Sequence, residues 1–167
     1  MIFKQLRVGK NGKCFTIYKF RTMKNDSHTL RKDLKELNKG KGPLFKIEND
    51  PRVINGANFI RDFSLDEIPQ LINVLKGDMS IVGPRPHMVE HDIHYSSLFG
   101  NFLKRHKCNP GLTGWAQVNG LRGATPAPEI MKRRMEFDLW YLNNWTIFLD
   151  VYIIFKTFYA IFKYKGD

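Results

Sequence analysis

Cysteine is scarce in this 167-residue sequence, which contains only Cys14 and Cys108. Their separation matches no metal-ligand spacing, so the sequence excludes a cysteine zinc site and a small secreted scaffold held by many disulfides. We expect two free thiols in a reducing, cytosolic setting, with a single disulfide as the alternative.

Long apolar runs are also absent. A membrane-spanning helix needs about 18 or more apolar residues in succession, and the nearest approach, 137–162, is interrupted by Asp138, Asp150 and Lys156. The chain opens MIFKQLRVGKNGK, without the apolar segment of a secretory signal. We therefore expect neither a spanning helix nor a signal peptide.

Acidic residues are outnumbered, because 16 Asp and Glu stand against 27 Lys and Arg, a formal net charge of +11. This excess predicts a polyanionic partner: nucleic acid, an anionic membrane surface or a phosphorylated substrate. The cations are spread among short motifs and match no nucleic-acid-binding pattern, so we expect no nucleic-acid partner. A basic module for single-stranded nucleic acid is the rival interpretation. The oligomeric state stays open, a homo-oligomer included.

No GxGxxG motif follows a predicted strand, which argues against a Rossmann fold. The length and the absence of repeats predict one domain over 1–167. We predict an α/β (α+β) fold of short strands and amphipathic helices. The expected strands are 3–8, 14–20, 44–48, 79–82 and 114–118. A turn at 9–12 would join the first two strands as a hairpin, and a turn at Pro110 and Gly111 would precede the last strand. The expected helices are 27–37, 65–76 and 127–144.

Two adjacent carboxylates, Asp66 and Glu67, begin the predicted helix 65–76. In a structural interpretation, Glu67 completes a capping box with Ser64 and Asp66 complements the helix dipole. In a functional interpretation, the acids are catalytic. Pro69 supports this, because a proline in the first turns removes a backbone N–H donor from the helix, and such local violations often occur at functional sites. Neighbouring helical residues point about 100° apart, so the acids would have distinct roles, one as nucleophile and the other handling a metal or a proton.

The same helix has an apolar stripe that we expect to face the core, formed by Leu65, Ile68, Leu71, Ile72 and Leu75. Asp66, Gln70 and Asn73 share the opposite face, which is then free for chemistry. Cations for an anionic substrate are near in sequence: Arg61 precedes the acids, and Arg85 lies between Pro84 and Pro86.

Lys19 and Arg21 are two residues apart on a predicted strand and so project to the same side, which suits a phosphate. A solvated basic strand face is the alternative. His87, His91 and His94 would face one zinc ion if their segment were helical, although no known zinc motif is matched. An exposed polar helix face explains these histidines equally well.

Two further segments admit two interpretations each. Trp115, Gln117 and Asn119 either contact a base or lie in an irregular loop packed by its Trp. The aromatic and basic tail 137–167 suits either a membrane interface or a core-packed terminal helix. In the helix before it, we expect Met131 and Met135 to face inward and the run 132–134 to face outward.

Four segments together resemble the bacterial sugar transferase family, the monotopic phosphoglycosyl transferases. They are IYKFRTM (17–23), GPLFKIENDPRV (42–53), FIRDFSLDEIPQLINVLKGDMSIVGPRP (59–86) and NPGLTGWAQVNGLRG (109–123). The resemblance implies a Mg²⁺-dependent transfer of a sugar 1-phosphate from a UDP-sugar to undecaprenyl phosphate. It places this reaction at the cytoplasmic face of the bacterial inner membrane, where it would initiate exopolysaccharide, capsule or O-antigen synthesis.

By position, Asp66 resembles the family's nucleophile and Glu67 its partner, with both next to the metal. Arg61 resembles the basic residue near the carrier phosphate, and 84–86 the proline-framed motif near the nucleotide. The segment 114–123, in which Gln117, Asn119 and Arg122 are weaker candidate contacts to nucleotide or sugar, resembles the branch that acts on hexose 1-phosphates.

The sequence departs from the family pattern in two places. Relatives carry a re-entrant hydrophobic helix before the strand that starts here at Ile2, and we expect its absence to affect membrane attachment. Ala124 stands where relatives usually have an acid, so we expect a substrate contact or loop hydrogen bond to be missing. An inactive homologue that binds a membrane or a partner is a further alternative.

Overall fold

The computed structural model describes residues 1–24, 50–123 and 127–163. The predicted helix 27–37, the predicted strand 44–48 and Ala124 lie outside these ranges. In the described part the strands are short and form two two-stranded sheets among helices. The predicted α/β class is therefore confirmed, and these sheets do not form the doubly wound arrangement of a Rossmann fold.

The first sheet is the predicted N-terminal hairpin. Strands β1 (Ile2–Val8) and β2 (Cys14–Phe20) pair antiparallel, with Ile2 opposite Phe20 and Val8 opposite Cys14. The turn contains the short 3₁₀ helix η1 (Lys10–Gly12), in which Asn11 has φ 54° and Gly12 has φ 75°. Asn and Gly tolerate this left-handed region better than other residues, so the turn sequence fixes the hairpin locally.

The second sheet joins two distant segments in parallel, β3 (Ser80–Val82) and β4 (Gly111–Thr113). The first strand was predicted, whereas the predicted turn at Pro110 and Gly111 is wrong because Gly111 pairs with Ser80. The predicted strand 114–118 is also wrong, since Trp115–Val118 is the short helix α5. Gly111 is required at its position because a Cβ there would overlap the backbone of Gly83.

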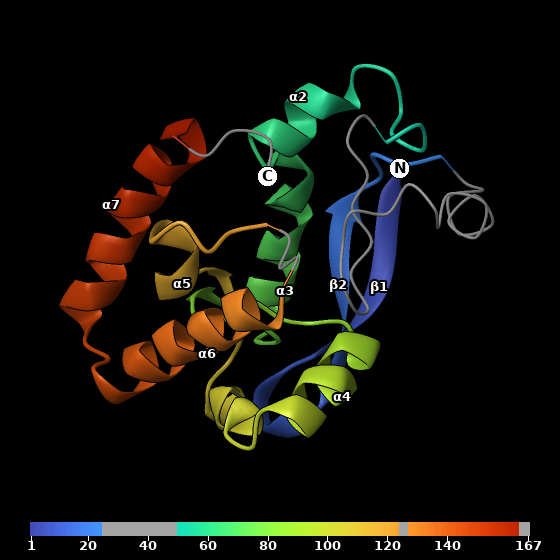
Figure 1. Ribbon diagram of the computed structural model, residues 1–167. Helices are drawn as coiled ribbons and strands as arrows, with labels where there is room; N and C mark the ends of the chain where they lie inside the picture. Colours follow the sequence, from blue (N-terminus) through green and yellow to red (C-terminus); the bar gives the residue numbers. More distant parts are fainter. Residues whose placement is uncertain (25–49, 124–126, 164–167) are drawn as a thin grey trace.

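Helices cover the lower half of the molecule in Figure 1, where α4 (Val89–Leu98) and α6 (Pro128–Asn143) lie near the 3₁₀ helix η4 (Phe102–Lys107). One core cluster contains Tyr95, Phe102, Met131 and Met135. The predicted helix 127–144 and its inward methionines are confirmed. The predicted outward position of Arg134 is wrong, because its buried side chain donates a hydrogen bond to the Gly123 carbonyl.

The C-terminal helix α7 (Ile147–Lys163) has two different faces. Ile153 is fully buried in a second core cluster with Val82, Val118 and Tyr141. The aromatic face is exposed, and Phe148 and Phe155 have 83% and 71% of their surface accessible. In the described residues no helix is both long and apolar enough to cross a membrane.

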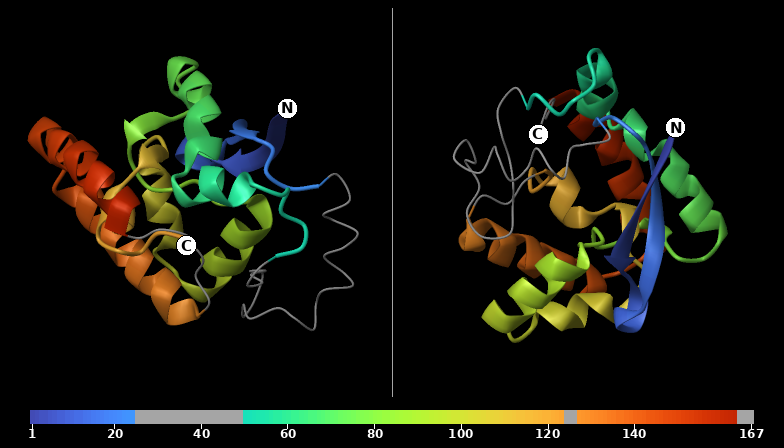
Figure 2. Two further views of the ribbon diagram at one scale, coloured as in Figure 1. Left: turned by 90° about the horizontal axis from the view of Figure 1, so that it is seen from above. Right: turned by 90° about the vertical axis from the view of Figure 1, so that its right-hand side faces the viewer.

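The acidic pair lies on a central helical column formed by α2 (Ala57–Asp62), η3 (Leu65–Gln70) and α3 (Leu71–Leu75). The column stands between the hairpin on one side and α7 on the other, as Figures 1 and 2 show. The acids therefore lie in the middle of the fold, within reach of segments from several parts of the chain.

The apolar stripe of this column faces the opposite way from the prediction. Gln70 and Asn73 are 1% and 0% exposed, whereas Leu75 is 89% exposed and the other four stripe residues are also exposed. The reason is that Asn73 binds β2: its Oδ1 accepts from the Tyr18 N–H at 3.1 Å and its Nδ2 donates to the Thr16 carbonyl at 2.8 Å. These bonds give partners to a backbone N–H and a carbonyl at the edge of β2 that does not pair with β1.

Candidate active site

The segment that carries the acids is a 3₁₀ helix and does not begin with a capping box. Ser64 has φ 53° and makes no side-chain capping bond, and the Glu67 side chain binds two cations instead. Pro69 lies inside η3 and is buried. The predicted capping box is therefore wrong, because Glu67 gains more from a charged partner than from a backbone N–H.

Glu67 is held by Lys19 from β2 and Arg85 from the loop after β3. Its Oε1 accepts from Lys19 Nζ at 2.6 Å and from Arg85 Nη2 at 2.5 Å, and its Oε2 accepts from Arg85 Nη1 at 3.1 Å. Burial alone would raise the pKa of Glu67, but Arg85 and Lys19 together hold it well below its usual range. Glu67 is thus a fixed negative charge that orients two cations.

Asp66 has a different environment. Within the described ranges its carboxylate accepts no hydrogen bond, and its side chain is half-buried. Burial raises the pKa of Asp66, and the Glu67 charge adds to the rise, while Lys19, Arg61 and Arg85 oppose it. The pair therefore consists of one carboxylate bound on both oxygens and one whose oxygens are available to a ligand.

Two further guanidinium groups, those of Arg7 and Arg134, lie close enough to Arg85 to be affected by its charge. Burial and, next in size, the neighbouring charge of Arg85 lower the pKa of Arg7 to about 10. Burial and Arg85 also lower the pKa of Arg134 to about 10. Crowded, partly desolvated guanidinium groups are a feature of phosphate-binding sites.

The other predicted phosphate-binding cations occupy different places. Arg61 acts on the Asp66 carboxylate and donates to Thr22 Oγ1 at 3.4 Å. The guanidinium carbon of Arg21 lies 5.6 Å from the centre of the Phe3 ring. No described contact joins Arg21 to the acids, so it does not share the position of Lys19.

The backbone of Arg85 is held by a buried ion pair that the sequence did not predict. Arg105 from η4 donates to Asp138 Oδ2 on α6 through Nε at 3.1 Å and Nη2 at 2.6 Å. The same Nη2 donates to the Arg85 carbonyl at 2.8 Å. Asp138 follows Met131 and Met135 on the inward face of α6, and a carboxylate at such a position was the available signal.

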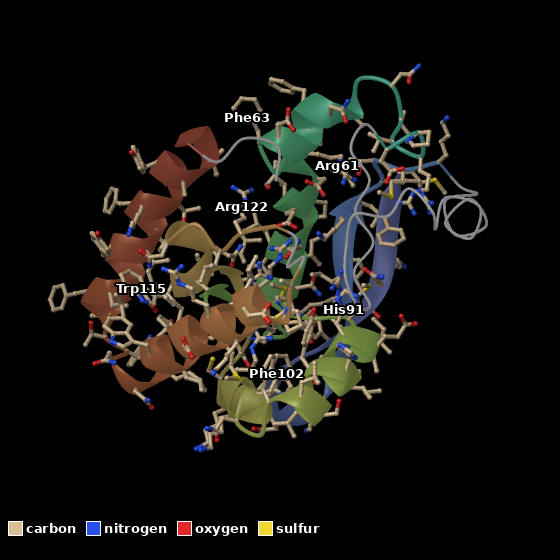
Figure 3. The ribbon with its side chains drawn as sticks, in the orientation of Figure 1. Arg61, Phe63, His91, Phe102, Trp115 and Arg122 are labelled. Carbon is tan, nitrogen blue, oxygen red and sulfur yellow. The ribbon has the colours of Figure 1, made fainter. Side chains whose placement is uncertain are left out.

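The segment 114–123 contributes to the site through Arg122, whose Nη2 donates to Ser64 Oγ at the start of η3. Figure 3 shows Arg122 and Phe63 on the side of the column that faces α7. Trp115 stacks on Trp140 at 5.0 Å, and Asn119 Oδ1 accepts from Lys156 at 2.7 Å, so both pack against neighbouring helices. Gln117 is buried, and among the described groups its Oε1 has no hydrogen-bond partner.

The three histidines do not form a zinc site. His87 lies before α4 and packs against Tyr95 and Phe102, while His91 is buried in the helix. Over the described ranges no group of three or more His, Cys, Asp or Glu could hold a metal ion. The exposed polar face is also wrong for His87 and His91, because both are buried. The two cysteines are free thiols, as predicted.

Comparison with known proteins identifies the family of the chain. Residues 1–164 match the family model described as bacterial sugar transferase. The chain is 46% identical over 99% of its length to "UDP-glucose:undecaprenyl-phosphate glucose-1-phosphate transferase" of Escherichia coli (strain K12), of which it covers 33%. It is 40% identical over 99% of its length to "Undecaprenyl-phosphate galactose phosphotransferase" of Salmonella typhimurium, of which it covers 34%.

A shorter relative is matched over most of its own length. The chain is 40% identical over 94% of its length to "Exopolysaccharide production protein PSS" of Rhizobium leguminosarum bv. phaseoli, and it covers 75% of that protein. It spans about a third of the two longer relatives. The extent of the family match and these identities together show that the chain belongs to the bacterial sugar transferase family.

Proposed function

We propose that this chain transfers a sugar 1-phosphate from a UDP-sugar to undecaprenyl phosphate through a covalent phosphosugar intermediate on Asp66. This reaction would initiate exopolysaccharide, capsule or O-antigen synthesis. The names of its relatives support the substrate classes. The observation that carries the mechanism is the unlike acid pair, in which Glu67 is bound by two cations and Asp66 is available.

In the first step an Asp66 carboxylate oxygen attacks the sugar-proximal phosphorus of the UDP-sugar. A bond forms between that oxygen and phosphorus, and the bond from this phosphorus to the bridging oxygen breaks. UMP leaves with the bridging oxygen and its electron pair, so no proton has to be transferred. The raised pKa of Asp66 favours this role, because a more basic carboxylate is a better nucleophile once it is ionised.

The surrounding cations would bind the diphosphate and offset its repulsion by the nucleophile. Lys19 and Arg85 already face the acids, and the positive charge of Arg61 also acts on Asp66. Glu67 holds Lys19 and Arg85 in place, so their positions do not have to be established when substrate binds. Pro84 and Pro86 restrict the backbone on both sides of Arg85, which serves the same purpose.

Mg²⁺ is the cofactor that we propose for this site. Mg²⁺ is commonly bound by one or two carboxylates together with substrate phosphates, and the Asp66 carboxylate fits this pattern. Glu67 is the second predicted ligand, although its oxygens already accept bonds from Lys19 and Arg85. When bound, Mg²⁺ would neutralise charge on the diphosphate oxygens and so favour attack by a carboxylate.

We also propose that the chain works at a membrane surface, at the cytoplasmic face of the inner membrane. The exposed aromatic face of α7 supports this, because aromatic side chains beside lysines favour the interface between lipid and water. Flotation of the chain with anionic vesicles would test it. A Phe148→Ser, Phe155→Ser variant should float less, and Leu103→Ser on η4 serves as the matched control.

The catalytic proposal is tested by measuring UMP release from UDP-glucose and UDP-galactose. Asp66→Asn should abolish release, and a peptide containing Asp66 in the unmodified chain should gain the mass of one phosphosugar. Asp62→Asn, an acid on the neighbouring helix α2, is the matched control and should retain release. Full release by Asp66→Asn, or a phosphosugar on another residue, would refute the assignment of the nucleophile.

A further inference from the structure

An apolar cavity of about 320 Å³ begins beside Glu67 and extends between the central column and α7. The column contributes Leu65, Ile68 and Leu71, and the opposite side contributes Leu112 from β4 with Ile154 and Phe158 from α7. Three of these are members of the stripe that the sequence predicted to be buried in the core. Its exposure is explained here by a cavity that a ligand can fill.

The polar groups of this cavity gather near the acids. Ser64, Glu67, Gln117 and Arg122 all line it, and the Arg122 guanidinium donates to the Ser64 hydroxyl. Gln117 is more than nine-tenths buried, and in the described part of the chain its Oε1 has no hydrogen-bond partner. The cavity therefore combines a charged end next to the catalytic acids with an apolar remainder.

We propose that this cavity holds the isoprenoid chain of the phosphate acceptor, with the acceptor phosphate at the Arg122 end. A UDP-sugar is polar along its whole length and does not match an apolar lining. A polyprenyl phosphate has one anionic end and an apolar chain, and both parts match. This inference rests on the proposed function and adds to it the site of the second substrate.

The size of the cavity limits what it holds. At about 30 Å³ for each water-sized group, it has room for on the order of ten such groups, or two five-carbon isoprene units. The rest of a longer chain would leave past Phe158, which is exposed and belongs to the aromatic face of α7. The chain would therefore continue along the surface that we assign to the membrane.

This placement sets the second step of the reaction. An oxygen of the acceptor phosphate, directed by Arg122, attacks the phosphorus of the phosphosugar on Asp66. A new bond from phosphorus to that oxygen forms, the bond from phosphorus to the Asp66 oxygen breaks, and the carboxylate is regenerated. The donor diphosphate and the acceptor would then reach the acids from different sides, since Lys19 of β2 binds Glu67 from the hairpin side.

The test compares acceptors of one, two, three and eleven isoprene units. In the unmodified chain kcat/KM should rise at least about tenfold between one and two units, because burial of apolar area accompanies the added unit. Leu112→Trp, which fills the cavity, should remove this gain. Leu75→Trp places the same ring on the same column outside the cavity lining and should keep it. A gain that survives Leu112→Trp, or that Leu75→Trp also removes, would overturn the proposal.

A second pair of variants tests the same site independently, in case Leu112→Trp does not fold. Leu71→Glu changes a side chain that is exposed at the cavity and should raise KM for undecaprenyl phosphate at least about tenfold. Leu75→Glu is its control and should change KM less than about twofold. Equal effects of the two substitutions would indicate a general surface effect and refute a specific cavity site.

Photocrosslinking separates this inference from the proposed function, because it needs no turnover. A geranyl phosphate analogue with a photoreactive chain, added without UDP-sugar, should label peptides from α7 and β4. Labelling confined to other peptides would refute the cavity site even if UMP release is normal. Absence of UMP release from any UDP-sugar would instead refute the catalytic proposal, whatever the labelling pattern.

Discussion

The buried pair of Arg105 and Asp138 should be required both for stability and for the position of Arg85. The two side chains are only 2% and 3% exposed. Removing one partner of such a pair leaves an uncompensated buried charge and typically costs about 3–5 kcal/mol. We therefore expect Asp138→Asn to lower the free energy of unfolding by that amount, out of a total of about 5–15 kcal/mol for a native domain.

Urea unfolding of Asp138→Asn measures this loss of unfolding free energy directly, and thermal unfolding measures the accompanying shift in melting temperature. For a chain of this size each kcal/mol shifts the melting temperature by about 2–4 °C, so the shift should be roughly 6–20 °C. Glu136→Gln removes an exposed carboxylate from the same helix and is the matched control, with a change within about 0.5 kcal/mol. A loss below about 1 kcal/mol for Asp138→Asn would refute the assigned role of the pair.

A double variant separates stability from positioning. Apolar residues of similar volume often replace a buried ion pair without loss of stability, so Arg105→Met combined with Asp138→Leu should recover much of the unfolding free energy. It cannot donate to the Arg85 carbonyl, a bond that Arg105 makes at 2.8 Å. UMP release should therefore stay low in the double variant. Recovery of both stability and UMP release would show that Arg105 is structural and does not position Arg85.

Three further predictions follow from other contacts. Glu67→Gln should reduce UMP release at least about tenfold, because charge-assisted bonds to Lys19 and Arg85 are lost. The same substitution should also reduce the decrease in unfolding free energy at low pH. The pKa of Glu67 is lowered on folding, so the stability it contributes is present above its unfolded value near 4.5 and is lost as pH falls through the folded value. Urea unfolding from pH 3 to 7 would measure it, and equal pH profiles for the two chains would contradict this reasoning. Gly111→Ala should destabilise the fold by about 1–3 kcal/mol or more, because its Cβ would overlap the Gly83 backbone; Gly100→Ala, where a Cβ meets open space, is the control. Burial raises the pKa of Cys108 to about 11, so a thiol reagent at pH 8 should label exposed Cys14 first, and equal rates would contradict this.

Features determined by neighbouring residues were predictable from the sequence. The hairpin followed from a Gly and Asn turn between two β-forming runs, and helix α6 from the period of Met131 and Met135. The strand 79–82 was likewise predicted from a short apolar run. The site residues Asp66, Glu67, Arg61 and Arg85 were named from a family resemblance together with charge chemistry, and the structure brings all four together.

Features that depend on distant partners were not predictable in the same way. Arg105 and Asp138 are 33 positions apart, and no local pattern connects them. The strand at Gly111 was missed because a three-residue parallel pairing depends on Ser80, far away in the chain. The capping box failed for the same reason, since Ser64 and Glu67 have the right spacing but Lys19 and Arg85 compete for Glu67.

Among the incorrect predictions, the direction in which the apolar stripe of the column faces bears most on function. A period of about 3.6 residues shows that one face of a helix is apolar, and it does not show whether protein or another apolar phase covers that face. Here Asn73 bonds to the edge of β2 and turns the polar face inward, which leaves Leu65, Ile68 and Leu71 at a cavity beside Glu67. An apolar face that the protein itself leaves uncovered next to an acidic pair is a disadvantage for a domain whose substrates are all polar. It becomes useful if one substrate is an isoprenoid, because the same rotation of the column then leaves the apolar cavity beside Glu67, the neighbour of the proposed nucleophile Asp66.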